Sequence, residues 1–197
     1  IVKRYDIDGL HMDDYFYPYP IQGLKLPDNE TFKKYGLNKG YEQGEIDRWR
    51  RDNVNKLVKE ISDTIKAIKP YVKLGISPFG IYRNKQQDET GSETNGLSNY
   101  DNLYADTQLW ANNGWVDYMI PQLYWEVGHP AADYNTLFNW WKDNKAPDVQ
   151  LYIGQDVSRS QDQIAKKLNP TRVAENISGN CFWSGDMLLA NKNEYKD

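Results

Sequence analysis

The stretch DRWRRDNVNKLVKEISDTIKAIKPYVKLGIS (residues 47–77) decides the fold class. Its first part predicts an amphipathic helix over 47–69, because apolar residues recur at steps of three and four: Val54, Leu57, Val58, Ile61, Ile65 and Ile68. Pro70 ends this helix, and the short run 71–77, closed by Pro78, is typical of a strand. A helix leading directly into a strand indicates an α/β fold.

The same alternation continues on both sides of this stretch. Further helices are expected over 104–113, where Gly114 stops the helix, over 134–144, and over 160–168, where Ser160 can cap the N-terminus. Further strands are expected over 7–12, 115–125, 149–154 and 180–183. Five strands separated by helix-bearing segments predict right-handed crossovers and a parallel sheet.

A parallel sheet of this kind is either a (β/α)8 barrel or an open doubly wound sheet. Polar and aromatic residues gather at the C-terminal ends of different expected strands, which favours the barrel, because its active site lies there. Two long loops, 15–45 and 82–102, follow strand ends and would cover that site. The second is polar and rich in Gly and Ser, so a disordered surface loop fits it equally.

Composition limits the classes of function. The chain has 197 residues, 39% of them hydrophobic, and is expected to form a single domain over 1–197. Its net charge of -4 comes from interspersed charges, which excludes an electrostatic footprint for nucleic acid. No run predicts a membrane span or signal peptide, and the opening at Ile1 inside an ordered-looking segment predicts that upstream residues have been removed. Cys181 has no partner and is expected to be a small buried side chain.

The segment from Tyr5 to Pro18 carries the main candidate site. Period-two alternation puts His11 and Asp13 on one face of the first strand and Asp14 on the other. Neighbouring carboxylates repel, which raises one pKa and leaves the other group ionised, and glycoside hydrolysis needs this division between acid and base. Asp13 and Asp14 are therefore candidate catalytic residues, although such a pair also suits a helix cap or a solvated turn.

Aromatic residues near these carboxylates point to a sugar ligand, because sugar rings bind flat aromatic faces and polar side chains. The candidate platforms are Tyr15, Tyr124, Trp125 and Trp183, and the candidate polar contacts are His11, Ser77, Gln122 and Gln155. Glu126 is a third candidate catalytic carboxylate, and an ordinary exposed glutamate fits it as well. The remaining tryptophans near helices are assigned to packing: Trp49, Trp110, Trp140 and Trp141.

Other kinds of chemistry lack their motifs. The sequence contains no Gly-rich phosphate loop and no Gly-x-Ser-x-Gly elbow, so kinase and serine hydrolase chemistry are set aside. His11 has no second His or Cys at ligand spacing, which favours a hydrogen-bonding histidine over a metal ligand. We expect neither a metal nor another cofactor.

Five ordered motifs together resemble the bacterial glycosyl-hydrolase-like family ten. They begin at Asp8, Trp49, Lys73, Trp115 and Leu151: DGLHMDDYFYP, WRRDNVN, KLGISPFG, WVDYMIPQLYW and LYIGQ. The resemblance covers nearly the whole chain. It implies a (β/α)8 barrel in which DGLHMDD is the fourth strand, so that this chain supplies strands four to eight and lacks the first three.

The same resemblance implies a secreted protein of the bacterial envelope, periplasmic or lipid-anchored as a lipoprotein. The implied activity is cleavage of O-glycosidic bonds in an envelope polysaccharide, including the glycan strands of peptidoglycan. A barrel has no edges, so a five-strand arc is expected to need the missing strands or a second copy for closure.

A more distant likeness is to chitinase-type barrels, whose fourth strand reads Asp-Gly-x-Asp-x-Asp-x-Glu. Asp8 and Asp13 match it, whereas Tyr15 occupies the place of the acid Glu. The proton donor would then be Asp14 or Glu126, and Asp13 could polarise an N-acetyl group of the substrate. Two alternatives stay open: a non-catalytic carbohydrate-binding barrel, and an open sheet that binds a small polar ligand.

Overall fold

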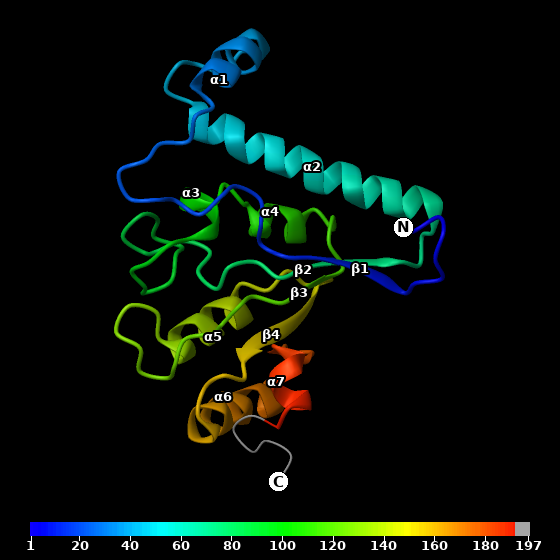
Figure 1. The fold of residues 1–197 in the computed structure, drawn as a ribbon, viewed down its shortest axis with the longest axis vertical. Coiled ribbons are helices and arrows are strands. Elements are labelled where there is room, and N and C mark those ends of the chain that lie inside the picture. The colour runs from blue at the N-terminus through cyan, green and yellow to red at the C-terminus, as the bar shows by residue number, and fades with distance from the viewer. Residues whose placement is uncertain (192–197) are drawn as a thin grey trace.

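The computed structural model describes residues 1–191 and shows five parallel strands curled into a half-barrel (Figure 1). The strands are neighbours in chain order: β1 (Gly9–Met12), β2 (Lys73–Ile76), β3 (Tyr118–Met119), β4 (Gln150–Asp156) and β5 (Gly179–Trp183). Register follows from pairs such as His11 with Gly75 and Tyr118 with Gln150. The predicted α/β class and partial barrel are confirmed.

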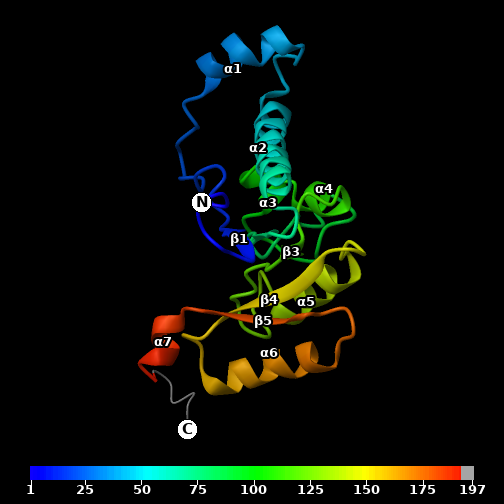
Figure 2. The same cartoon turned by 90° about the vertical axis from the view of Figure 1, so that its right-hand side faces the viewer.

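Seven helices accompany the sheet in the described residues. They are α1 (Asn29–Tyr35), α2 (Ile46–Ile68), α3 (Asn99–Asn102), α4 (Thr107–Asn112), α5 (Tyr134–Asp143), α6 (Gln161–Val173) and α7 (Gly185–Leu189), with a 3-10 turn over Leu37–Lys39. Figure 2 shows α2, α4, α5 and α6 following one another in an arc on one side of the strands. No described helix has the length and apolar character that a membrane span needs.

The apolar core lies between the strands and this arc. Strands β2, β3 and β4 turn apolar residues outward, where side chains of α2, α4 and α5 bury them. One buried cluster contains Leu74, Ile76, Met119, Leu151 and Ile153 of the strands and Val58, Trp110 and Trp141 of the helices. The opposite face of the sheet, on the inside of the curl, carries polar and aromatic side chains. The polar and aromatic side chains of the sheet are therefore gathered on its concave side.

Gly75 on β2 makes room for a large ring on that concave side. Its Cα lies beside Tyr118, and a methyl group at this position would overlap the tyrosine ring. Tyr118 in turn stacks on His11, with ring centroids 5.7 Å apart. Glycine is needed at position 75 because the ring of Tyr118, on the neighbouring strand β3, occupies the space that a side chain on β2 would fill.

The helix predicted over 47–69 and the Ser160 cap are confirmed, and Ser160 accepts a hydrogen bond from the backbone of Gln163. The long strand expected over 115–125 is wrong. Only Tyr118–Met119 forms a regular ladder, since Pro121 has no N–H, although Gln122 still pairs with Phe79 and Gly154. Helix α6 runs past the expected end at Leu168 to Val173, with Pro170 inside it. Contacts with β5 hold the extra turn.

One expectation about exposure needs correction, and one open alternative about a loop is decided. Cys181 is exposed instead of buried, because it lies on the edge strand β5 and no described strand covers its concave side. Of the two readings of the 82–102 segment, the structure supports a folded loop over a disordered one. Asn84 is buried there and its amide binds Thr94, Gly96 and Gln87. The first loop, 15–45, contains the short helix α1, which has no clear periodic signal in the sequence.

Candidate functional site

Three strand ends meet at the C-terminal rim of the half-barrel. The Gln122 amide, after β3, donates to Asp13 Oδ1 at 2.8 Å and to the carbonyl of Ser77 at 3.0 Å. Asp13 follows β1 and Ser77 follows β2, so one amide links three elements that are far apart in the sequence. The predicted convergence of Asp13, Ser77 and Gln122 is confirmed as geometry.

His11 lies one step deeper on the concave face. Its Nε2 is 2.8 Å from the Ser77 hydroxyl, and its Nδ1 is 3.2 Å from the Tyr118 hydroxyl. Burial lowers the pKa of the His11 imidazole, and the charge of Asp13 opposes this change. A neutral ring with both nitrogens in hydrogen bonds fits a positioning role, since the ring then braces Ser77 beneath the rim.

The two adjacent carboxyl groups have different surroundings. Asp13 is exposed, and its Oδ1 also accepts the Asp14 N–H at 2.9 Å. Asp14 is only 2% exposed and accepts a short hydrogen bond from the Tyr19 hydroxyl. Burial raises the pKa of the Asp14 carboxyl, Tyr19 opposes the rise, and the charge of Asp13 adds to it. The pair therefore combines an accessible carboxylate with a buried carboxyl that holds its proton to higher pH.

An aromatic pair stands next to the carboxyl groups. Tyr124 and Trp183 stack with ring centroids 5.6 Å apart and 20° between the planes, and Trp183 is 56% exposed. Burial raises the pKa of the Tyr124 hydroxyl, and the charges of Asp13 and Asp14 add to this, so the ring lies within electrostatic reach of both. The pair is a ready platform for an apolar face of a ligand.

The other predicted aromatics lie differently. Trp125 packs its ring edge-on against Phe79 at 5.3 Å, and Phe79 contacts Tyr19 in the same way at 6.0 Å. The three rings contact one another in a row that ends at Tyr19, whose hydroxyl donates to Asp14. Tyr15 is 81% exposed and projects from the loop after β1.

Gln155 does not share this rim, contrary to its prediction as a substrate contact. It is 0% exposed, and its amide donates to the Tyr134 hydroxyl at 3.0 Å and to Asn180 at 2.9 Å. Strand alternation turns it toward α5 and α6. Glu126 lies in the loop after β3, exposed and 3.9 Å from Arg159, so its ion pair is on the α6 side of the loop.

The loop after β3, which carries Tyr124 of the aromatic platform, is held from the helix side by two basic residues. Lys167 of α6 donates to the carbonyl of Leu123 at 3.1 Å, and Arg159 donates to the carbonyl of Tyr124 at 3.2 Å. Lys167 is 0% exposed and lies 5.0 Å from the centre of the Tyr134 ring. Burial lowers the pKa of Lys167 to about 8, and Arg159 adds to this effect.

Sequence reasoning missed several of these contributors. Tyr118 lies an even number of residues before Gln122 and Tyr124 in the predicted strand 115–125, so the period of two could have placed it on the same face as those two residues. Tyr19 was visible only as one of several tyrosines after the first strand. Lys167 had no sequence signal, because burial of a lysine on a polar helix depends on tertiary packing.

Comparisons with known proteins identify the family of this chain. A family model described as Glycosyl hydrolase-like 10 matches residues 1–171. Glycosyl hydrolase YngK of Bacillus subtilis (strain 168) is 55% identical over 209 residues, covering 100% of this chain and 40% of that protein. Glycosyl hydrolase DigH of Escherichia coli (strain K12) is 46% identical over 155 residues, covering 78% of this chain and 34% of that protein. The chain thus spans well under half the length of these relatives.

Proposed function

Because the chain belongs to the glycosyl hydrolase-like 10 family, we propose that it forms the carboxylate-bearing half of a glycoside hydrolase barrel that cleaves O-glycosidic bonds. The observation that carries the proposal is the rim itself. Asp13 is oriented by Gln122 and by the Asp14 N–H, and the Tyr124–Trp183 platform stands beside it. Carboxyl groups next to stacked rings are what a glycosidase needs to hold and cleave a sugar.

In this proposal the two aspartates have separate roles. Asp14 holds the proton that goes to the leaving oxygen, since burial raises its pKa. Tyr19 covers Asp14 in the free protein, so the incoming sugar must displace the tyrosine hydroxyl before the proton can be passed on. Asp13, exposed and fixed by two donors, faces the sugar and polarises either an attacking water or an N-acetyl group of the substrate.

We further propose an envelope polysaccharide built from amino sugars as the substrate, with peptidoglycan glycan strands as the first candidate. Its support is the family resemblance together with the aromatic platform beside the carboxyl groups of the rim. An extracytoplasmic location, as a secreted or lipid-anchored protein, belongs to the same proposal. Glu126 stays a reserve proton donor, although its ion pair with Arg159 draws it away from Asp13.

Closure of the barrel belongs to the proposal as well. Within residues 1–191, β1 and β5 each have one neighbour, and the exposed Cys181 and Trp183 lie on the concave side of β5. We expect further strands of the whole protein, or a second copy, to pair with these edges. The greater length of the relatives is consistent with the first of these.

The test compares Asp13→Asn with a matched variant in the intact protein. Asp148→Asn makes the same change at an exposed residue just before β4, at the opposite end of the strands. With peptide-free and intact peptidoglycan as substrates, Asp13→Asn should release reducing ends at least about 100-fold more slowly than the native protein, with unchanged circular dichroism. Asp148→Asn should keep native turnover. Native turnover in Asp13→Asn would remove the assignment.

A non-catalytic carbohydrate-binding barrel is the second candidate. It is favoured by Tyr15, which is exposed where chitinase-type barrels carry their acid glutamate. It predicts saturable glycan binding by the native protein with no reducing ends released. The same experiment therefore separates the two candidates.

A further inference from the structure

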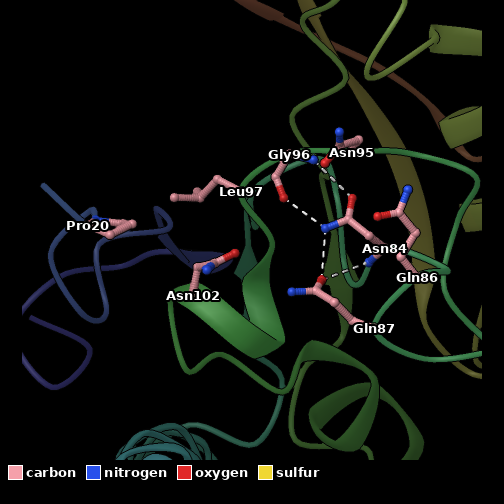
Figure 3. Close-up of a pocket in the computed structure, with 8 residues that line it drawn as sticks. All are labelled: Pro20, Asn84, Gln86, Gln87, Asn95, Gly96, Leu97 and Asn102. Atoms are coloured by element: carbon pink, nitrogen blue, oxygen red, sulfur yellow. Dashed lines mark hydrogen bonds between the residues drawn. The ribbon is translucent and has the colours of Figure 1, made fainter. Parts of the chain in front are cut away.

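A second pocket lies in the ordered loop that follows β2, outside the carboxylate rim (Figure 3). It encloses about 380 Å³ and is lined mainly by amide side chains: Asn84, Gln86, Gln87, Asn95 and Asn102, together with Pro20, Gly96 and Leu97. None of these lining residues carries a charge. The pocket therefore offers neutral hydrogen-bonding groups beside two apolar surfaces.

Two of the amides have their oxygen atoms fixed by the protein. Gln87 Oε1 accepts from Asn84 Nδ2 at 2.8 Å, and Asn102 Oδ1 accepts from the Ser98 N–H at 2.8 Å. Each amino group must then point away from these donors, and Figure 3 shows the Gln87 amino group directed toward the side of the pocket where Asn102 lies. Neither amino group donates to a protein acceptor in the part of the chain that the structure describes.

The pocket is formed before any ligand arrives. Asn84 is buried, and it donates to the carbonyl of Gly96 at 2.8 Å while its Oδ1 accepts from Thr94 at 2.9 Å. Through Gln87, this network also fixes one of the two outward amino groups. Little ordering of the loop is then needed on binding, which favours affinity.

A neighbouring cavity lies between the pocket and Tyr19. Pro20 and Asn102 also line this cavity of about 650 Å³, and Tyr19 lines it too. Tyr19 is the residue whose hydroxyl binds Asp14. A chain-like ligand held at Asp13 and Asp14 could therefore extend past Tyr19 and reach the amide pocket.

The chemistry of the lining selects the ligand group. Convergent N–H donors suit an uncharged acceptor such as an amide carbonyl, and the apolar faces of Pro20 and Leu97 suit a methyl group. A phosphate would favour Arg or Lys, which this lining lacks. An acetamido group combines a carbonyl oxygen with a methyl group in one planar unit.

We propose that the amide pocket is a second saccharide-binding site, which takes the acetamido group of a sugar unit remote from the carboxylate pair. The proposal rests on the proposed function only in taking a glycan as the ligand of the rim. It adds a site at which neutral amides, instead of carboxylates and rings, recognise the polymer.

The test removes the two amino groups and keeps the bonds that their oxygens accept. Gln87→Glu with Asn102→Asp does this in the intact protein, in an Asp13→Asn background so that ligands are not consumed. The matched control makes the same two changes at exposed residues outside the pocket, Gln43→Glu with Asn135→Asp. Chito-oligosaccharides of increasing length are titrated by calorimetry against cello-oligosaccharides of equal length, which have hydroxyls in place of acetamido groups.

We expect the longer chito-oligosaccharides to bind at least about tenfold more weakly to the pocket variant, because two hydrogen bonds are lost and two carboxylates face the carbonyl. Short chito-oligosaccharides, the cello series and the control variant should show no such loss. The single Gln87→Glu change gives the same test with a smaller loss, of about threefold or more, should the double variant unfold.

Unchanged affinity for the long chito-oligosaccharides, or an equal loss for the cello series, would overturn the acetamido site. This result is separable from the proposed function. Hydrolysis abolished by Asp13→Asn with no effect of the pocket variant sinks the second site alone. A selective loss of chito-oligosaccharide binding in the pocket variant, together with no release of reducing ends by the native protein, leaves the second site standing and rejects the hydrolase.

Discussion

Lys167 provides the sharpest test of the packing between α6 and the loop that follows β3. This lysine of α6 is fully buried, donates to the carbonyl of Leu123 and lies over the Tyr134 ring. The charged groups around it are Arg159, Asp156 and Glu126. The perturbation is Lys167→Met, which keeps a flexible chain of similar length and removes the amino group.

The magnitude follows from the pKa of the lysine. Burial lowers it from 10.5 to about 8, which corresponds to about 3 kcal/mol of penalty on the charged form at neutral pH. The pKa is lower in the folded state, so the unfolded chain binds more protons between pH 8 and 10.5, and stability rises with pH across that window. Methionine has no such dependence. The free energy of unfolding of the native protein, relative to Lys167→Met, should therefore rise by about 2 to 3 kcal/mol between about pH 7 and pH 10.

Urea denaturation of the intact protein at a series of pH values measures this difference. Comparing native protein with variant cancels the titration of all other groups. The control is Lys166→Met, which removes a neighbouring exposed lysine paired with Asp162 at 3.0 Å and should change stability by about 0.5 kcal/mol or less at every pH. If Lys167→Met and the native protein keep a constant difference from neutral to alkaline pH, the lysine is not buried as a charge and the reasoning fails.

Two further predictions concern the concave face and the rim. Gly75→Ala should lower the free energy of unfolding by about 2 kcal/mol in urea denaturation, because the added methyl group displaces the Tyr118 ring. Gly44→Ala is the control and should change stability little, since a methyl group there meets open space. Equal stability of the two variants would contradict the packing described. Tyr19→Phe removes the hydrogen bond that opposes the rise in the pKa of Asp14, so the alkaline limb of the kcat/KM profile should move to higher pH if Asp14 is the proton donor. An unmoved limb would remove Asp14 from that role.

Much of the fold could be predicted from periodicity. The stripe of α2 and the stop at Pro70 predict the helix to within one residue at each end. The errors arise where tertiary contacts outweigh local signals. Pro121 interrupts a run that looks like one long strand, and contacts with β5 carry α6 through Pro170. The exposure of Cys181 depends on which strands lie beside β5, and no local pattern contains that information.

The candidate site could be predicted only in part. Asp13, Ser77 and Gln122 were found because the ends of parallel strands meet at one rim. Gln155 was misplaced because a single residue changes which face of a strand a side chain occupies, and the end of β4 was not known accurately enough. The amide pocket was beyond reach, since it depends on how the polar loop closes around Asn84.

The unbroken order of the strands has a consequence for engineering. Each strand pairs only with the strands next to it in the chain. The loop over 82–102 closes around Asn84, and outside itself it binds Ala131 and Trp140 through backbone groups of Asn95 and Thr90. Because backbone groups make these two outer bonds, we expect that the loop can be exchanged with the matching loop of a relative, while the Gln122 amide still ties the three strand ends together. The ligand preference of this loop and the proposed hydrolytic site could then be varied separately on one scaffold.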